Sequence, residues 1–339
     1  MNILIVRNDK LGDFILSLPS FALLKTCMPD ATIFALVPEY TSELAQTCPF
    51  IDKVIIDKPL NNPISDNVSL QKELSSHKID SIISIYSTTR VGLAAFLTGI
   101  KYRLAPATKI AQIFYNHRLT QGRSRSEKPE YEYNLELVQK FLKDHGIQGI
   151  PNPEPPFLSF EQAQINQLRN RFIQDLNIDK NNKLIFIHAG SGGSANNLSL
   201  QQYATLIKYL ESDTGHTIVL TAGPGEEQHA NNLSQLLKNT THIVYNSTEG
   251  LLRFTQHIAF ADLFIAGSTG PLHIAGALNV PTAAFYTRRR SATPLRWQTL
   301  NTPDRRLAFT PPDTADAMDM SQIDIEEAAK EISKKFLKN

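Results

Sequence analysis

The first nineteen residues set the strongest constraint on the fold of this chain. Residues 3–6 form a short apolar run, Ile-Leu-Ile-Val, which is long enough for a buried parallel strand. A polar stretch follows at 7–10, and apolar residues then recur at helical spacing from Phe14 to Leu24. The chain therefore opens as strand, loop and helix. The loop lies at the carboxyl end of the first strand, where open α/β sheets place their ligands.

The same alternation of short apolar runs and helical patterns continues along the chain and is typical of doubly wound parallel sheets. It predicts strands at 32–37, 54–56, 81–85, 184–187, 217–221, 243–245, 263–266 and 281–285, and an edge strand at 101–104. A proline-rich stretch at 149–156, GIPNPEPP, interrupts the alternation as a stiff linker. A length of 339 residues also favours two domains. We therefore predict an α/β protein with Rossmann-like domains at 1–155 and 156–320 and a C-terminal helix within 321–339.

Composition excludes several classes of protein. The net charge of +1 implies no polyanion partner, and we find no nucleic-acid motif. No uninterrupted apolar run reaches the roughly 18 residues of a membrane-spanning helix. Cys27 and Cys48 offer neither metal spacing nor a disulfide framework, and the chain opens on a strand rather than a signal peptide. We expect a soluble cytoplasmic protein, at most peripheral to a membrane.

The first loop holds candidates for chemistry and anion binding. Asp13 follows Gly12, which lets a ligand come close, so its carboxylate can act as a general base. Aspartate is also a favoured helix N-cap, and capping is the alternative interpretation of Asp13. Arg7 and Lys10 can bind an anion or remain solvated loop charges.

The segment 101–126 is cationic and contains no Asp or Glu. It can bind the phosphates or carboxylates of an acidic acceptor, or lie against anionic lipid head groups. A solvated loop is the alternative interpretation. Lys101, Arg103 and Arg118 are its candidate acceptor-binding residues.

Residues 262–273, DLFIAGSTGPLH, form the second candidate site. A predicted strand runs into small residues, and a helix begins near Pro271, where the missing N–H costs nothing. The free N–H groups and the dipole of such a helix end favour an anion, and a diphosphate fits well. An ordinary capped turn is the alternative interpretation. The candidate donor-binding residues here are Ser268, Thr269, Gly270 and His273.

Three further loops in the second half follow predicted strands. The loop HAGSGGSANNL at 188–198 can wrap a phosphate through backbone N–H groups at Gly190, Ser191 and Gly192. It is neither a Walker A loop nor a GxGxxG fingerprint, which argues against a dinucleotide oxidoreductase. Glu226 can complement the dipole of the next helix. The basic residues after the last strand, Arg288 and Arg289 among them, can contact phosphates or stay solvated.

Two motifs resemble one known family. The run Ile5-Val6-Arg7, Leu11-Gly12-Asp13 and Leu18-Pro19 resembles the start of the family-9 glycosyltransferases, the heptosyltransferases of lipopolysaccharide core assembly. Thr269, Gly270 and His273 match the second signature of that family. The resemblance implies that Asp13 is the catalytic base and that Glu226 binds ribose hydroxyls. It also makes Arg7, Lys10 and Gly12 candidates to bind the acceptor, and Asn196 a candidate to bind the donor.

The resemblance also implies an architecture and a reaction. The architecture is GT-B, with two Rossmann-like domains facing each other across a cleft and a C-terminal helix that packs back on the first domain. The reaction is inverting transfer of a heptose from ADP-heptose, without a metal or other cofactor, to an acidic Kdo-lipid A or core oligosaccharide. Such acceptors lie at the cytoplasmic face of the inner membrane, where peripheral contact would place the enzyme.

The chain departs from the family pattern at two places that bear on the donor. Ser268 stands where the family has an acidic residue, and Asn196 stands where it carries a lysine. These departures leave open a family-9 transferase that uses another nucleotide sugar and glycan acceptor. A GT-B sugar-nucleotide epimerase, or a binding module without turnover, is the further alternative.

Overall fold

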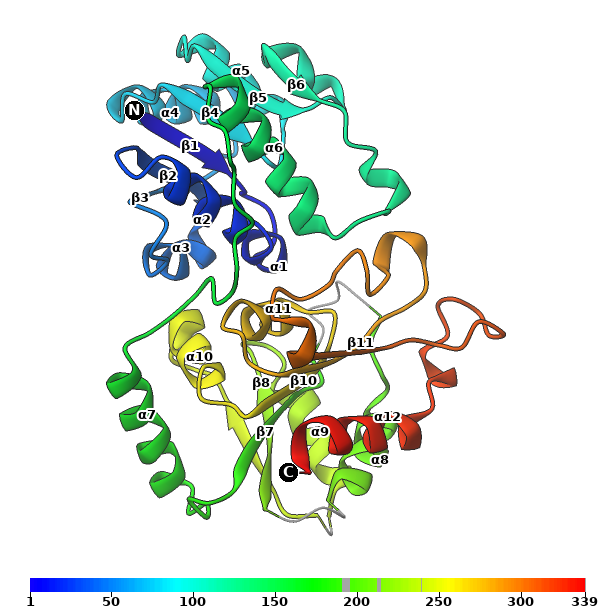
Figure 1. Ribbon diagram of the computed structural model, residues 1–339. Helices are drawn as coiled ribbons and strands as arrows, with labels where there is room; N and C mark the ends of the chain where they lie inside the picture. The colour runs from blue at the N-terminus through cyan, green and yellow to red at the C-terminus, as the bar shows by residue number, and fades with distance from the viewer. Residues whose placement is uncertain (191–195, 212–214, 239, 339) are drawn as a thin grey trace. The chain divides into compact units, whose positions relative to one another are not determined.

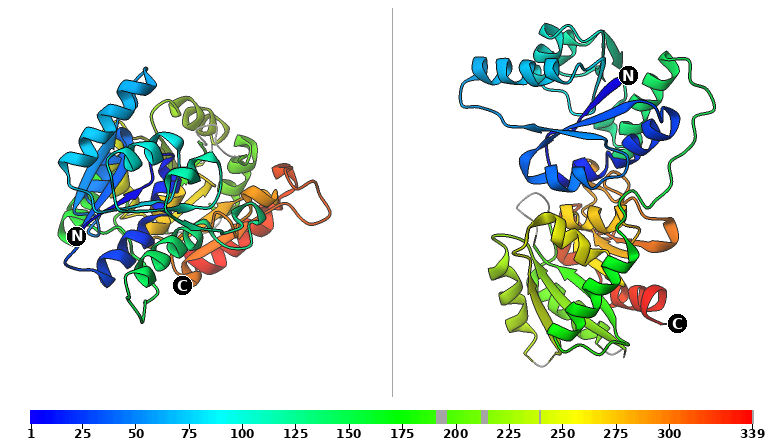
Figure 2. Two further views of the ribbon diagram at one scale, coloured as in Figure 1. Left: turned by 90° about the horizontal axis from the view of Figure 1, so that it is seen from above. Right: turned by 90° about the vertical axis from the view of Figure 1, so that its left-hand side faces the viewer.

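The computed structural model describes residues 1–190, 196–211, 215–238 and 240–338 (Figure 1). Contacts divide the chain into two compact units, Met1–Leu158 and Ser159–Asn339. The boundary follows the proline-rich stretch and lies three residues beyond the predicted one. Helices cover both faces of the sheet in each unit (Figure 2).

The first unit is built on one parallel sheet with the strand order β3-β2-β1-β4-β5-β6. The strand β1 lies in its middle, paired with β2 and β4, and residues 3–6 are fully buried as their continuous apolar run predicts. The strands are β1 (Asn2–Val6), β2 (Thr32–Pro38), β3 (Lys53–Asp57), β4 (Ser81–Ser84), β5 (Tyr102–Pro106) and β6 (His117–Leu119).

Successive side chains of β1 point to opposite faces of this sheet. Leu4 and Val6 pack with α4 and α5 in one buried cluster, and α2 and α6 pack on each other. The helices are α1 (Leu11–Ile15), α2 (Leu18–Cys27), α3 (Glu39–Gln46), α4 (Pro63–Ser76), α5 (Thr89–Leu97) and α6 (Glu130–Asp144), with the 3₁₀ turns η1 (Ile110–Phe114) and η2 (Arg123–Arg125).

The second unit repeats the same winding with the order β12-β11-β10-β7-β8-β9, again all parallel. Its strands are β7 (Lys183–His188), β8 (His216–Ala222), β9 (His242–Asn246), β10 (Leu263–Gly267), β11 (Thr282–Phe285) and β12 (Arg306–Phe309). The strand order therefore reverses between β1 and β4 in one sheet and between β7 and β10 in the other. Doubly wound sheets bind ligands beyond the carboxyl ends of the strands at such reversals.

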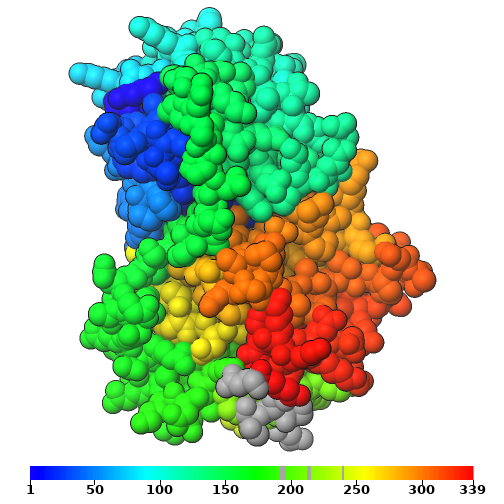
Figure 3. Space-filling model, in the orientation of Figure 1, coloured from blue at the N-terminus to red at the C-terminus, as the bar shows by residue number. Residues whose placement is uncertain are grey.

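The helices of the second unit include the C-terminal one. They are α7 (Gln162–Asp175), α8 (Leu200–Leu210), α9 (Glu227–Leu236), α10 (Gly250–Ile258), α11 (Gly270–Ala277) and α12 (Ile325–Ile332), with short turns η3 (Arg290–Ala292), η4 (Pro303–Arg305), η5 (Met320–Gln322) and η6 (Ser333–Leu337). The C-terminal segment, red in Figure 3, lies on the surface of this unit.

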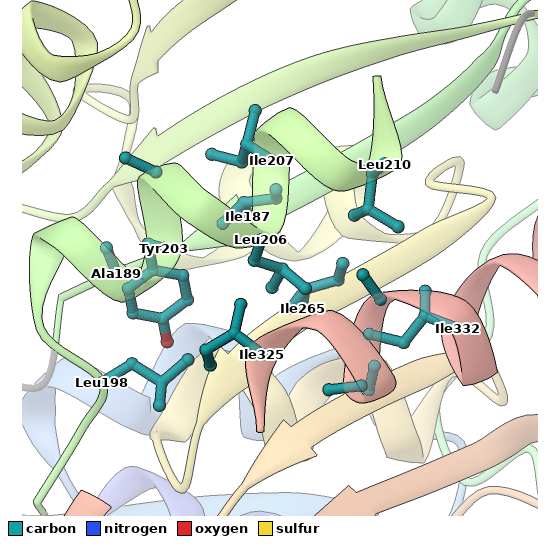
Figure 4. Close-up of a cluster of buried hydrophobic side chains, with 14 of the residues drawn as sticks. Ile187, Ala189, Leu198, Tyr203, Leu206, Ile207, Leu210, Ile265, Ile325 and Ile332 are labelled. Carbon is teal, nitrogen blue, oxygen red and sulfur yellow. The ribbon is translucent and has the colours of Figure 1, made fainter. Parts of the chain in front are cut away.

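The apolar face of α12 packs on α8. Ile325 and Ile332 join Leu206 and Leu210 of α8 in one buried cluster (Figure 4). The resemblance implied that this helix packs back on the first domain, but its buried stripe is covered by α8 of its own unit. The amphipathic pattern specified which face is buried and not which element covers it.

Two strands were absent from the sequence prediction. The strand predicted at 101–104 is confirmed as β5, but β6 lies outside it, so the predicted edge position is wrong. The strand β12 forms the edge of the second sheet beside β11. Both missed strands are short and carry cationic residues: β6 has no apolar run, and the run in β12 is only the three residues 307–309. None of the described helices is long and apolar enough to cross a membrane.

Replacing Ile332 by Ala should lower the free energy of unfolding of the second unit by about 3 kcal/mol, because the side chain is fully buried in the α8–α12 cluster. Glu331→Ala on the exposed face of the same helix is the matched control and should cost little. Urea unfolding of both variants measures the difference. Equal stability of the two variants would contradict the packing of α12 on α8.

Candidate functional site

A buried arginine organises the carboxyl end of β1. Arg7 is only 3% exposed, and its guanidinium contacts three carboxylates. Its Nε lies 2.9 Å from Oδ1 of Asp9, and its Nη1 lies 3.5 Å from Oε1 of Glu130. Its Nη2 donates a hydrogen bond to Oδ1 of Asp13. A buried charge needs such compensation, so the three carboxylates and Arg7 fix one another in place.

Glu130 connects this cluster to the cationic segment. It lies at the start of α6, 123 residues from Arg7, and Arg123 Nη1 donates to its Oε1 over 2.7 Å. Burial opposes the charge of Arg7, but the carboxylates of Asp13, Asp9 and Glu130 outweigh it, so the pKa of Arg7 is raised. Arg7 is a predicted acceptor-binding residue, and the structure shows it buried and paired with three carboxylates.

Asp13 does not cap a helix. It lies in the first turn of α1, whose N-cap position is Lys10, and no side chain caps this helix. The side chain of Asp13 is 15% exposed and is held by Arg7. The carboxylate is thus fixed in orientation and still reachable at the carboxyl end of β1. This is the geometry expected of a positioned general base.

The neighbouring carboxyl group of Asp9 has a raised pKa. Burial raises the pKa of Asp9, Arg7 opposes the rise, and the like charge of Asp13 adds to it, which gives a value of about 6. Asp9 also receives a contact at its backbone, because the Tyr40 hydroxyl donates to its carbonyl over 2.9 Å.

The other predicted acceptor residues differ in their surroundings. Lys10 is exposed and Gly12 is half-buried beside the Asp13 carboxylate. Lys101 and Arg118 are exposed. Arg103 is engaged in packing, since its Nε donates to the carbonyl of Phe114 over 2.8 Å and its Nη1 to the carbonyl of Ile100.

In the second unit, the turn from β10 into α11 presents two buried polar groups. Thr269 occupies the N-cap position of α11 but makes no capping hydrogen bond. Within the ranges that the structure describes, neither Thr269 Oγ1 nor His273 Nδ1 has a hydrogen-bond partner. Burial lowers the pKa of His273 to about 4, so its ring is neutral near pH 7. Orphaned buried polar atoms beside free helix N–H groups indicate a place for an anionic ligand.

A second polar group lies at the carboxyl ends of β7 and β8. The Glu226 carboxylate lies 3.2 Å from Nε2 of buried His188 and accepts a hydrogen bond from the N–H of Gly223 over 3.3 Å. A Cβ at Gly190 would clash with this carboxylate. Glycine at 190 is therefore required for Glu226 to lie over the backbone of the loop.

Asn197 is a residue that the sequence analysis did not assign to the site. Its Nδ2 donates to the carbonyl of Ala189 over 3.0 Å, and its Oδ1 accepts from the hydroxyl of Tyr203 over 2.7 Å. A Cβ at Gly267 would clash with its amide. Asn197 thus joins the loops after β7 and β10. A lone asparagine in a polar loop gives no sequence signal for this role.

The remaining donor candidates lie in different settings. Ser268 is half-buried and Gly270 is the first residue of α11. Asn196 is exposed, and its Nδ2 donates to the carbonyl of Met318 over 3.4 Å. Ser191 and Gly192 lie outside the described residues.

The two arginines after β11 differ from each other. Arg288 is taken up by the loop at 311–315, where it donates to the carbonyls of Pro311, Pro312 and Ala315 and pairs with Asp313. These contacts hold Arg288 against the loop at 311–315, and phosphate binding by Arg288 stays a prediction. Arg289 is exposed. Across the described ranges, no group of three His, Cys, Asp or Glu side chains is placed to hold a metal ion.

Comparisons with known proteins agree on one family. The family described as "Glycosyltransferase family 9 (heptosyltransferase)" matches residues 67–314. A Haemophilus influenzae protein named "Putative glycosyltransferase" is 48% identical over 338 residues, which covers 99% of this chain and 97% of that protein.

Solved structures of that family share the fold. A family-9 glycosyl transferase from Veillonella parvula superposes with a TM-score of 0.83 at 17% identity, over 100% of this chain and 97% of that one. The ADP-heptose lps heptosyltransferase II of Escherichia coli superposes with a TM-score of 0.80 at 18% identity, over 99% of both chains. The two sheets and their helices therefore form the two-domain α/β fold of heptosyltransferase structures.

The raised pKa of Asp9 predicts a pH dependence of stability. Between about pH 4, the ordinary value for aspartate, and about pH 6, the native state holds a proton that the unfolded chain has lost. Stability conferred by this group therefore falls as the pH rises through that window. Asp9→Asn removes the titration, so its free energy of unfolding relative to wild type should rise by up to about 3 kcal/mol across the window.

Urea unfolding of wild type and Asp9→Asn at several pH values measures this difference. Groups that titrate in both proteins contribute equally to the two free energies of unfolding, so their contributions cancel. Asp30→Asn, an exposed aspartate of the same unit, is the control and should show a constant difference. A constant difference for Asp9→Asn as well would contradict the assignment.

Proposed function

The chain belongs to glycosyltransferase family 9, and from this premise we propose that it is an inverting enzyme in which Asp13 is the general base. The observation that carries the proposal is the Asp13 carboxylate, which a buried arginine orients at the carboxyl end of β1. Asp13 takes the proton of an acceptor hydroxyl while the oxygen of that hydroxyl forms a bond to the anomeric carbon of the donor. The bond from that carbon to the nucleotide diphosphate breaks in the same step.

The second unit is proposed to bind the nucleotide sugar. The leaving diphosphate gains negative charge, which the N–H groups at the start of α11 and the hydroxyl of Thr269 stabilise. His273 contributes a neutral hydrogen-bonding ring rather than a positive charge, because burial lowers its pKa to about 4. Glu226 accepts hydrogen bonds from the ribose hydroxyls, close to its contact with His188.

The substrates that we propose are ADP-heptose and an anionic, lipid-linked glycan of the lipopolysaccharide core. Support comes from the family and from the name of the Escherichia coli structure, an ADP-heptose lps heptosyltransferase. The reaction then takes place in the cytoplasm, at the inner face of the inner membrane, and needs no cofactor. Ser268 and Asn196 stand at departures from the family pattern, so the nucleotide and the sugar are the points to test first.

A panel of ADP-, UDP-, GDP- and dTDP-sugars tests the donor by thermal shift. ADP-heptose at 100 times its dissociation constant should stabilise the fold by about 2.7 kcal/mol. Preference for another sugar would preserve the mechanism and change the donor. Conversion of the donor without an acceptor would indicate an epimerase, and binding without transfer would indicate a binding module.

Replacing Asp13 by Asn should lower the rate of transfer roughly 100- to 10,000-fold, because the amide cannot accept the acceptor proton. Donor affinity should stay within about threefold of wild type, since Asp13 is proposed to act on the acceptor. Initial rates and calorimetric binding of ADP measure the two effects. Asp30→Asn serves as the control, and full activity of Asp13→Asn would refute the assignment of the base.

Replacing Thr269 by Val should separate binding from stability. The Thr269 hydroxyl is buried, and the described residues offer it no partner, so its removal should leave the free energy of unfolding equal or slightly higher. Affinity for ADP should fall about tenfold if the hydroxyl donates to a phosphate. Thr255→Val is the control, because that buried hydroxyl donates to Leu251 over 2.9 Å and should cost stability without affecting ADP. Unchanged ADP affinity in Thr269→Val would contradict the assignment.

A further inference from the structure

An apolar patch lies exposed on the first unit, outside the site described above. It consists of Phe96 and Leu97 at the end of α5 and Ile110 and Ile113 of η1, which are 51%, 54%, 75% and 68% exposed. Isolated exposed apolar residues are ordinary, but these four come from two elements that pack on each other. Segment 101–126, turquoise in Figure 3, reaches the surface of this unit.

The short helix η1 is anchored through one side only. Its inner residues Ala111 and Phe114, with Tyr115, pack together over Ala105 of β5, and the Tyr115 hydroxyl donates to Ser84 Oγ over 2.8 Å. A Cβ at Gly92 of α5 would come within 2.9 Å of the Tyr115 ring, so the two elements are closely apposed.

The outer side of η1 has no such cover. Ile110 and Ile113 are three residues apart, which places them on the same side of a 3₁₀ helix. The anchored inner side fixes the position of this turn, and the two isoleucines project from it. The exposure is therefore a property of a well-anchored element.

The segment that carries η1 also carries cations without acidic partners among the described residues. Residues 81–126 contain no Asp or Glu. Within the described part of the chain, none of Lys101, Arg103, Lys109 and Arg118 forms an ion pair. Arg103 stacks on the ring of Phe96 at 5.4 Å, and Lys109 precedes Ile110.

Strand pairing places two of these arginines on the same face as the patch. Arg118 pairs in register with Ala105, and Ala105 packs against η1. Arg103 is two residues before Ala105, so all three side chains lie on one face of the sheet. Positive charge and exposed isoleucine therefore share one surface.

We propose that this surface docks on an anionic lipid bilayer, with Ile110 and Ile113 inserted among the head groups and the exposed cations Lys109 and Arg118 against lipid phosphates. Apolar side chains framed by Lys and Arg are the combination that binds such interfaces, and each part alone is weak. The docking deepens the proposed function, since it rests on a lipid-linked acceptor being the substrate and names the surface that would bring the enzyme to it.

The charges argue against a second copy of the chain as the occupant. Two such surfaces meeting face to face would bring unpaired cations together, which is unfavourable. A soluble acidic glycan would explain the cations but would leave Ile110 and Ile113 without a role. An anionic bilayer satisfies both features.

Sedimentation with vesicles tests the proposal on the full chain. The protein should bind vesicles of phosphatidylcholine mixed with phosphatidylglycerol, bind pure phosphatidylcholine far less, and lose binding as the salt concentration rises. The double variant Ile110→Ser/Ile113→Ser should bind the anionic vesicles roughly tenfold or more weakly. Its thermal unfolding should match wild type, because both side chains are exposed.

The matched control is Ile64→Ser/Val68→Ser on α4 of the same unit. These side chains are 77% and 43% exposed, and the helix between and beside them carries acidic as well as basic residues. The control should bind vesicles as wild type does. Equal loss in both double variants, no loss in the Ile110/Ile113 variant, or no vesicle binding by wild type would each overturn the proposal. Loss of a dimer in the Ile110/Ile113 variant with unchanged vesicle binding would assign the patch to a second copy.

A transfer assay with a water-soluble, deacylated acceptor separates this proposal from the proposed function. The Ile110→Ser/Ile113→Ser variant should keep the wild-type rate on that acceptor. Vesicle binding by a wild-type protein that transfers no sugar would refute the proposed function alone. Transfer by a protein that ignores vesicles would refute the docking alone.

Discussion

The compensation of one buried charge determines the arrangement of the first site. Arg7 leaves the end of β1 inside the protein, where an unpaired guanidinium would be very costly. Asp9 and Asp13 come from the adjoining loop and helix, and Glu130 comes from α6. The same contacts that neutralise Arg7 therefore hold the Asp13 carboxylate at the carboxyl end of β1. Stability and the orientation of the proposed base depend on one set of interactions.

The second unit uses the same strand order with the opposite electrostatic design. At the turn from β10 into α11 the buried polar side chains are the Thr269 hydroxyl and the His273 ring, whose pKa is lowered by burial. An anion bound there would meet aligned N–H groups and dipoles rather than a fixed counter-charge. Leaving such neutral groups without partners costs less than leaving a buried charge unpaired. Two copies of one topology thus present the proposed base in one unit and the proposed anion-binding turn in the other.

The sequence predicted those parts of the fold that depend on local pattern. The run at 3–6, the doubly wound alternation and the start of α11 near Pro271 were all apparent from spacing and residue type. Long-range choices were not predictable. Glu130 lies 123 residues from Arg7, and nothing local to α6 marks it as a partner. The strand β6 has no apolar run, and the buried stripe of α12 does not name α8 as its cover.

The charge pattern can likewise be read from the sequence, whereas the pairing of the charges depends on the fold. The net charge of +1 conceals a stretch from 81 to 126 that contains no acidic residue. From the sequence alone the cations of this stretch cannot be distinguished, but in the folded chain some have a carboxylate partner and others have none among the described residues. Arg90 and Arg123 pair with carboxylates of other elements, so their charge is neutralised locally. The cations around Ile110 and Ile113 have no such partner among the described residues, so their field is directed outward to solvent. An unneutralised field beside exposed apolar side chains is consistent with selection for an external anionic surface, since folding alone would favour pairing the charges and covering the isoleucines.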